Sequence, residues 1–315
     1  MNPLSAIYKT VTATRNRLYD RGILGSRSLS RPVISVGNIS VGGSGKTPFV
    51  ILLGESLKQR GIIFDVLSRG YGRETRGVLA VDPDGSPRDF GDEPLLIAKR
   101  LQCPVIVGED RYQAGVFAEK RHTSAYHLLD DGFQHRSLAR DFDIVLLSPE
   151  DVHDQPLPFG RLREPLSSLR RADAIVLSEE IDRSLLPAAK AVWRVRRNLQ
   201  IPATSSVNKP IVFCGIARPR KFVEQLRTAG IQPVAEKFYR DHHRYTDRDL
   251  SDLLELKTRH QADGFIATQK DAINLGERYV HLAPITFPPV KIELIEPTDA
   301  LDTMLRIIAE RRAGA

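Results

Sequence analysis

The most constraining feature of this sequence is a glycine-rich segment at residues 33–48, which reads VISVGNISVGGSGKTP. A short β-branched run leads into the glycines, and Lys46, Thr47 and Pro48 follow them. A strand, a glycine-rich loop and a helix in this order bind phosphate groups, because backbone N–H groups and the positive helix N-terminus surround the anion. Pro48 suits the first helical turn, which makes no use of its missing N–H. The segment therefore predicts a nucleoside triphosphate site.

Within this segment, we expect Lys46 to reach the β- and γ-phosphates and the Thr47 hydroxyl to bind Mg²⁺. The predicted nucleotide contacts are Ser40, Val41, Gly42, Gly43, Ser44, Gly45, Lys46 and Thr47. The usual form of this motif has glycine at the position of Ser40. A small residue suffices there, because the glycines that follow supply the backbone freedom. An ordinary glycine-rich turn is the alternative, and it does not account for the Gly-Lys-Thr ending.

The composition is that of a soluble globular protein, with 41% hydrophobic and 27% charged residues in 315. The two cysteines, Cys103 and Cys214, form no CxxC pair and have no metal-ligand spacing with histidine. These features argue against a disulfide framework or a zinc site and favour a reducing cytoplasm. No apolar run approaches the roughly 20 residues of a membrane span, and no segment resembles a signal peptide.

Positive charge is concentrated at the N-terminus, where residues 1–31 contain six basic residues and one acidic residue. This segment accounts for most of the chain's net charge of +7. At helical spacing, apolar side chains fall along one face: Leu4, Ile7, Tyr8, Val11, Leu18 and Tyr19. A basic amphipathic helix over residues 1–30 can lie on an anionic membrane, or it can pack on its own domain. No recognition motif supports binding to nucleic acid.

Continuous apolar runs alternate with helical segments through the first part of the chain. The runs are residues 62–67, 105–107, 125–129, 144–147 and 174–177. Strands that are apolar on both faces belong to a mostly parallel sheet covered by helices. We therefore predict an α/β fold, with a P-loop domain over residues 31–190. The composition changes after this domain, so we predict a linker at 191–209 and a second, smaller α/β domain at 210–315.

Two aspartates, Asp130 and Asp131, follow one of these buried runs. In P-loop enzymes a carboxylate at the end of a strand holds Mg²⁺ and its waters. A simple loop start is the alternative interpretation. The phosphate loop upstream favours the metal site.

Four further motifs carry polar groups whose role the residue types leave open. Asp92 begins a predicted helix, where a capping role is sufficient. Arg69 and Arg73 lie among glycines, in a loop suited to an anion or to a plain surface turn. His242 and His243 can handle protons or be structural. Residues 268–271 are weakly similar to a base-reading loop of nucleotide-binding proteins.

Seven motifs together resemble the tetraacyldisaccharide 4′-kinases, the lipid A kinases of Gram-negative bacteria. In order along the chain they are residues 35–48, 67–73, 91–94, 129–135, 157–165, 241–243 and 268–271. The resemblance spans roughly residues 1–275. It implies transfer of the ATP γ-phosphate to the 4′-hydroxyl of tetraacyldisaccharide 1-phosphate, giving lipid IVA, at the cytoplasmic face of the inner membrane.

The resemblance also implies roles for single residues. Asp92 is the expected base, supported by one of the His242/His243 pair. Thr47, Asp130, Asp131 and Glu164 are the expected metal site, and Arg69 and Arg73 are expected to contact phosphate. A P-loop ATPase or nucleotide switch acting on a protein partner is the competing interpretation. The motifs around Asp92 and His242 favour the kinase.

Overall fold

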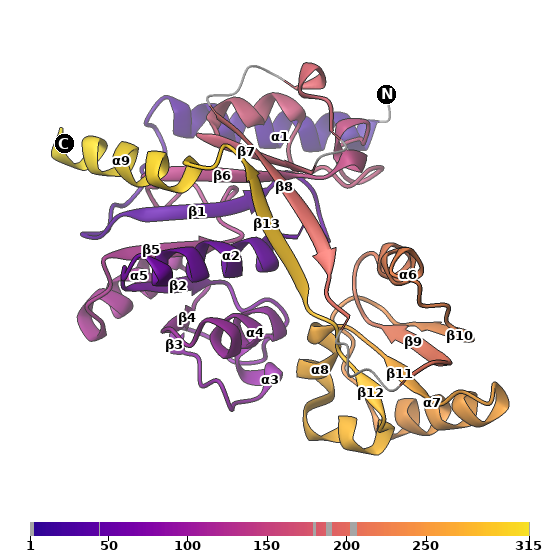
Figure 1. The fold of residues 1–315 in the computed structure, drawn as a ribbon. Coiled ribbons are helices and arrows are strands. Elements are labelled where there is room, and N and C mark those ends of the chain that lie inside the picture. The colour runs from indigo at the N-terminus through magenta and orange to yellow at the C-terminus, as the bar shows by residue number, and fades with distance from the viewer. Residues whose placement is uncertain (1–2, 44, 179–180, 187–190, 202–206, 315) are drawn as a thin grey trace.

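The structure is a computed structural model that describes residues 3–43, 45–178, 181–186, 191–201 and 207–314. A larger α/β unit is built around a long twisted sheet, and a smaller α/β unit lies beside one end of it (Figure 1). The predicted fold class, a mostly parallel sheet with a second smaller α/β unit, is confirmed.

Nine strands of the described chain form the large sheet, in the order β13-β8-β7-β6-β1-β5-β2-β4-β3. Their bounds are β1 (Val33–Asn38), β2 (Phe64–Ser68), β3 (Leu79–Ala80), β4 (Val105–Val107), β5 (Tyr126–Asp130), β6 (Phe142–Leu147), β7 (Ala174–Ser178), β8 (Ala191–Leu199) and β13 (Val290–Glu296). Within this order, the seven strands from β8 through β4 run parallel to one another. The two edge strands, β13 and β3, pair antiparallel with β8 and β4. The carboxyl ends of β1, β2 and β5 therefore meet at one edge.

Helices cover both faces of this sheet. They are α1 (Pro3–Asp20), α2 (Lys46–Gln59), α3 (Pro87–Phe90), α4 (Asp92–Leu101), α5 (Arg111–Arg121) and α9 (Ala300–Ala313), with short 3₁₀ turns η1 (Pro149–Val152), η2 (Leu166–Arg171) and η3 (Arg183–Leu185). Ile34 of β1 packs in one cluster with Phe49 of α2 and Met304 of α9. Its neighbour Val33 packs in a second cluster with Ala114 of α5. Alternate residues thus reach opposite faces, as expected for a strand buried on both sides.

The smaller unit is a four-stranded parallel sheet in the order β10-β9-β11-β12. Its elements are β9 (Pro210–Cys214), α6 (Pro219–Thr228), β10 (Ala235–Phe238), α7 (Asp247–Arg259), β11 (Gly264–Ile266), α8 (Gln269–Leu275), η4 (Gly276–Leu282) and β12 (Ile285–Thr286). Phe213 and Phe265 pack edge to face in its core.

The predicted domain boundaries are wrong in two places. Residues 191–199, predicted as part of a linker, form β8 of the large sheet. Residues 290–313, predicted as part of the second domain, return to the large unit as β13 and α9. The physical reason is the antiparallel pairing of β8 with β13, two strands about 90 residues apart in the chain. Residues 202–206 of the predicted linker lie outside the described residues.

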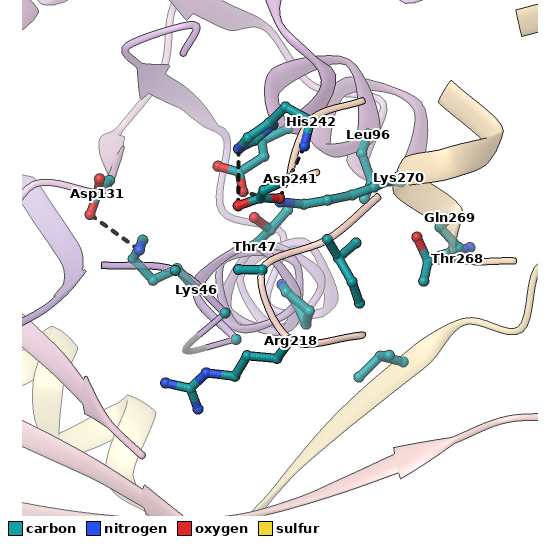
Figure 2. A pocket seen from close by; sticks show the side chains of 18 of the residues that line it. Lys46, Thr47, Leu96, Asp131, Arg218, Asp241, His242, Thr268, Gln269 and Lys270 are labelled. Atoms are coloured by element: carbon teal, nitrogen blue, oxygen red, sulfur yellow. Dashed lines mark hydrogen bonds and ion pairs between the residues drawn. The ribbon is translucent and has the colours of Figure 1, made fainter. Parts of the chain in front are cut away.

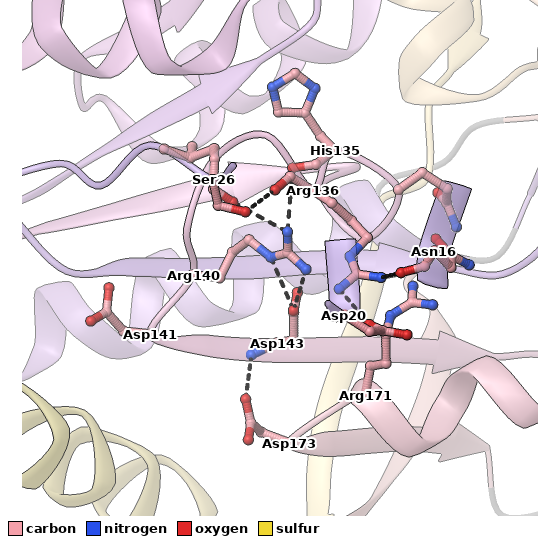
Figure 3. Close-up of polar contacts among 12 residues, drawn as sticks. Asn16, Asp20, Ser26, His135, Arg136, Arg140, Asp141, Asp143, Arg171 and Asp173 are labelled. Carbon is pink, nitrogen blue, oxygen red and sulfur yellow. Dashed lines mark hydrogen bonds and ion pairs between the residues drawn. The ribbon is translucent and has the colours of Figure 1, made fainter. Parts of the chain in front are cut away.

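The C-terminal half of α1 packs on its own chain through polar contacts (Figure 3). Arg136 donates to the Asn16 carbonyl at 3.0 Å and pairs with Asp20 at 2.7 Å. Arg15 donates to the Gln134 carbonyl at 3.0 Å. Val11, in contrast, is 62% exposed. Nearer the N-terminus, Tyr8 also donates to the Arg163 carbonyl at 3.1 Å. The helix is therefore anchored to the protein, while the apolar side chain of Val11 faces outward.

Candidate active site

The phosphate loop joins the end of β1 to the start of α2. Gly45, the residue before α2, has φ 86°, a left-handed conformation that glycine adopts without strain. Thr47 is 4% exposed in the first turn of α2. Ser44 lies outside the described residues, and the side chain of Ser40 is fully buried below the loop. The loop thus presents a helix N-terminus at the carboxyl edge of the sheet.

Lys46 connects this loop to the aspartates that follow β5. Its Nζ lies 3.1 Å from Asn38 Oδ1 and 3.4 Å from Asp131 Oδ1. Asp131 also accepts from Arg163 at 3.0 Å. Burial opposes ionisation of Asp131, but the charges of Lys46 and Arg163 outweigh it and lower the pKa of this carboxyl. The phosphate loop and the two aspartates that follow β5, which are distant in the sequence, therefore lie in contact in the structure.

A cavity of about 520 Å³ opens between the two units at this edge. Figure 2 shows Lys46 and Asp131 in one part of it and His242, Asp241 and Lys270 in another. Its lining includes most of the predicted nucleotide contacts: Val41, Gly42, Gly43, Gly45, Lys46, Thr47 and Arg69. The second unit contributes apolar and basic side chains: Ile216, Ala217, Arg218, Lys221 and Phe222. An apolar pocket next to a basic loop suits a nucleotide.

Asp130 lines the cavity and is only 1% exposed. Its Oδ2 accepts from Ser68 Oγ at 3.0 Å, whereas its Oδ1 is buried and has no hydrogen-bond partner. Burial, together with the charges of Glu93 and Asp131, raises the pKa of Asp130 to about 7. A divalent cation would satisfy the unpartnered oxygen and favour the ionised form. The residues present therefore fit a magnesium ion.

The described residues contain no group of three or more His, Cys, Asp and Glu side chains arranged to hold a metal ion. A magnesium ion does not require one, because it commonly takes one or two carboxylates and completes its shell with water and phosphate oxygens. Asp130, Asp131 and Thr47 all line the cavity and can supply such a partial shell.

A carboxylate–imidazole pair links the two units. His242 Nδ1 lies 2.8 and 2.9 Å from the two oxygens of Asp92, and Asn274 donates to Asp92 at 3.1 Å. Burial raises the pKa of Asp92, but the hydrogen bond from His242 and the charge of Lys270 outweigh it and lower the pKa to about 2. Burial lowers the pKa of His242, but the hydrogen bond and the negative charge of Asp92 outweigh burial and raise the pKa of His242 above its usual value. The pair is therefore ionic, with His242 lining the cavity and Asp92 behind it.

These pKa shifts predict how pH changes the stability that the pair provides. The Asp92 contribution is present above its usual pKa of 3.8 and is lost as pH falls toward 2. The His242 contribution is present below its usual pKa of 6.5 and is lost as pH rises through the raised value. We expect His242→Gln to lower the urea midpoint most between about pH 4 and pH 6.5. Urea unfolding of both proteins from pH 4 to pH 9 tests this, and a pH-independent difference would contradict it.

Gly91 sets the approach of the Asp92 helix to the loop after β2. Its φ of 88° and ψ of 153° suit only glycine, and a Cβ there would lie 2.9 Å from the Tyr71 carbonyl oxygen. We expect Gly91→Ala to displace Asp92 and lower kcat by about 10-fold or more. Gly61→Ala is the control, because Gly61 also has positive φ but nothing within 4 Å of an added Cβ. Steady-state kinetics of the two variants make the comparison. Equal kcat for both would show that this close approach does not position Asp92.

Besides the buried Ser40 and Asp92, three further predicted site residues do not line the cavity. His243 Nε2 lies 3.1 Å from Asp249, and its ring stacks on Tyr239 at 4.4 Å, so only His242 of the two histidines contacts Asp92. Arg73 is 3% exposed and pairs with Glu109 at 2.7 Å, away from the phosphate loop. Neither side chain lines the cavity.

Glu164, expected near the metal, does not line the cavity either. Its carboxylate is 2% exposed and accepts from Arg171 at 2.8 Å and from Asn16 at 2.7 Å. A carboxylate held by an arginine and an amide is already satisfied. Glu164 therefore connects α1 to the 3₁₀ turn η2 within the large unit.

Sequence reasoning missed several residues around the Asp92–His242 pair. Asn274 and Lys270 come from α8, which residues 268–271 begin. Thr268 and Asp271 form a capping box that starts this helix, and Thr268, Gln269 and Lys270 line the cavity. The only available signal was the motif itself, since nothing local shows that α8 faces α4.

A phosphate loop with its lysine, a buried strand-end carboxylate and a carboxylate–imidazole pair surround one cavity. Together with the P-loop fold, this arrangement defines a kinase, an enzyme that positions a nucleotide and an acceptor for phosphoryl transfer. The family model for tetraacyldisaccharide-1-P 4′-kinase, LpxK, matches residues 1–309. The chain belongs to this family, as its motifs predict.

Individual relatives agree with this assignment. A tetraacyldisaccharide 4′-kinase of Koribacter versatilis is 50% identical, and the alignment covers 100% of both chains. The corresponding protein of Aquifex aeolicus is 36% identical over 92% of this chain and 93% of its own. A crystal structure of LpxK from Aquifex aeolicus, described as an apo form in complex with ATP, has a TM-score of 0.80. That chain is 34% identical, with 97% of this chain and 98% of that chain covered.

Proposed function

We propose that this protein transfers the γ-phosphoryl group of ATP to the 4′-hydroxyl of tetraacyldisaccharide 1-phosphate, forming lipid IVA. The observation that carries the proposal is the meeting of Lys46 and the Asp92–His242 pair at one cavity. The phosphate loop binds the donor, and the pair faces the remaining space. A nucleotide switch has no need of such a pair opposite its phosphates.

Phosphoryl transfer depends mainly on positioning and charge neutralisation. Lys46 and the loop amides stabilise charge on the transferred phosphate. Arg69 and Arg218 line the same cavity and add positive charge around it. Thr47, Asp130 and Asp131 would hold Mg²⁺, which neutralises phosphate charge when bound.

Above the raised pKa of His242, its neutral ring takes up the proton of the acceptor hydroxyl, and the ionised Asp92 stabilises the imidazolium that forms. His242 lines the cavity, and Asp92 holds its ring from behind with Asn274 as a further partner. In this arrangement the two groups act as a unit, with Asp92 supplying the negative charge that makes proton uptake favourable. The sequence-based role of Asp92 as the base remains a prediction.

The test is direct. The protein is incubated with γ-labelled ATP, Mg²⁺ and the detergent-dispersed disaccharide 1-phosphate, and the lipid is separated and counted. Label in the lipid, dependent on both substrates, is the expected result. Release of labelled phosphate with no labelled lipid would instead identify an ATPase.

We also propose that the protein binds peripherally to the anionic cytoplasmic face of the inner membrane through α1. Among the described residues, no helix is both long and apolar enough to span a bilayer. The proposal is supported by the exposed Arg17 and Arg21, and by Val11 at 62% exposure. Each buried CH₂ of an acyl chain is worth about 0.8 kcal/mol, so extraction of a tetraacylated substrate would be costly. An enzyme that binds at the surface avoids this cost.

We expect the triple variant Arg15→Gln, Arg17→Gln and Arg21→Gln to bind anionic vesicles more weakly, by about 1 kcal/mol per charge. Added salt should weaken wild-type binding in the same direction, because exposed charges are screened. Val11→Ser should weaken binding with less dependence on salt, since its contribution is apolar. Vesicle co-sedimentation measures all of these. Leu4 and Ile7, predicted on the same face, have side chains outside the described residues.

The matched control removes three arginines elsewhere on the surface: Arg259, Arg278 and Arg306. It leaves the same net charge as the α1 variant. If both triple variants bind equally, net charge alone governs the attraction. If neither differs from wild type, the membrane contact lies outside α1.

A further inference from the structure

Lys270 lies at the start of α8 in the smaller unit and reaches across the cavity toward the larger one (Figure 2). Its ammonium forms an ion pair with the carboxylate of Glu93. The two side chains are 22% and 24% exposed, so the pair is largely shielded from water. A shielded pair is screened less than a surface pair and holds its geometry better.

Negative charge surrounds the ammonium of Lys270. Burial lowers the pKa of Lys270, but Glu93, Asp92 and Asp241 outweigh it and raise that pKa, so the side chain stays cationic. One turn further along α8, Asn274 donates to Asp92 at 3.1 Å. Two residues of α8, Lys270 and Asn274, therefore contact two consecutive acidic residues of the facing helix.

Those two residues are the first turn of α4. Asp92 and Glu93 are its first and second residues, so a contact that fixes Glu93 also limits movement of Asp92. Glu93 lines the cavity, and its negative charge is one of the causes that raise the pKa of Asp130. Without Lys270, this charge would lose its partner beside the phosphate site, and the start of α4 would lose a restraint.

We propose that Lys270 is a positioning residue for phosphoryl transfer, which holds Glu93 across the cavity so that the Asp92–His242 pair meets the acceptor hydroxyl. This inference rests on the proposed kinase function. Lys270 acts through Glu93 and the first turn of α4, and a misplacement of about 1 Å at such a site can cost about 10²-fold in rate.

The test compares Lys270→Met, which keeps the size and removes the charge, with Lys270→Arg, which keeps the charge. The matched control is Arg244→Met. Arg244 also bridges the two units, by an ion pair with Glu74 and a 2.8 Å hydrogen bond to the Gly72 carbonyl, but it does not line the cavity. We measure kcat, KM for ATP and KM for the disaccharide in each variant, together with the melting temperature.

We expect Lys270→Met to lower kcat by about 10- to 100-fold and to change KM for ATP by less than about 3-fold. Lys270→Arg should recover most of the loss, and Arg244→Met should stay near wild type. Equal losses in the Lys270→Met and Arg244→Met variants would overturn the proposal, because they would assign Lys270 to bracing the two units. Wild-type kcat in Lys270→Met would also overturn it. An inactive wild type would overturn the proposed function itself and this inference with it.

Discussion

Replacing Lys46 with Ala is expected to lower kcat by at least about 10²- to 10³-fold while leaving the fold intact. The ammonium lies in the cavity 3.4 Å from Asp131 and 11% exposed, so it contributes charge to the site and little to the core. Asp131 also pairs with Arg163 at 3.0 Å, so removal of Lys46 does not leave this carboxylate without a partner. Loss of a preorganised positive group at the transferred phosphate removes stabilisation that exists mainly in the transition state.

Lys58→Ala is the control for this experiment, because Lys58 is an exposed lysine in the last turn of the same helix. It should leave both kcat and the melting temperature near wild type. Circular dichroism and a thermal melt establish whether Lys46→Ala is folded, and the labelled-ATP assay gives the rate. A folded Lys46→Ala variant with near-wild-type kcat would remove Lys46 from the mechanism.

Asp92→Asn is expected to lower kcat by about 10²- to 10⁴-fold with a much smaller change in KM for ATP. A group that assists proton transfer acts in the transition state, so its loss affects turnover more than nucleotide binding. The amide retains the shape of the carboxylate but cannot hold His242 as an ion pair. The expected loss therefore measures charge and proton affinity more than packing.

Capping of α4 is the competing explanation for Asp92, and it predicts a loss of about 1 kcal/mol in stability with little kinetic effect. The structure has Gly91 as the N-cap and Asp92 as the first helical residue. Asp110 provides a matched control, because it is a true N-cap that accepts from Tyr112 N at 2.9 Å. Asp110→Ala should lower the melting temperature and leave kcat unchanged. The same pattern in Asp92→Asn would leave only a structural role.

Much of the large unit could be predicted because its signals are local. Residues 33–48 contain strand, loop and helix start within one continuous segment, so the phosphate loop needs no distant partner to be recognised. Apolar runs such as residues 144–147, which lie in β6, indicate buried strands by composition alone. Asp130 and Asp131 could be predicted as a metal site because they end a buried strand downstream of the phosphate loop, as in P-loop enzymes.

The domain division could not be predicted in the same way. Residues 191–199 and 290–296 each have the pattern of a strand, but neither indicates which sheet it joins. Their antiparallel pairing returns the chain to the large unit beyond the residues that form the smaller one. Pairing between strands that are distant in the chain depends on the whole packed structure, so the pairing partners cannot be identified from a single sequence.

Within the site, the sequence by itself determined the types of chemical groups, and the tertiary structure decided which of them meet. The motif at 241–243 offered two histidines. His242 has a left-handed φ of 57°, and it is His242 that contacts Asp92, whereas His243 pairs with Asp249. Glu164 has the residue type of a metal ligand but is held by Arg171 and Asn16. Lys270 and Asn274 enter the site because α8 packs against α4. The phosphate-loop motif is a local property of the chain, whereas the Asp92–His242 pair joins side chains 150 residues apart, so only long-range packing could assemble it.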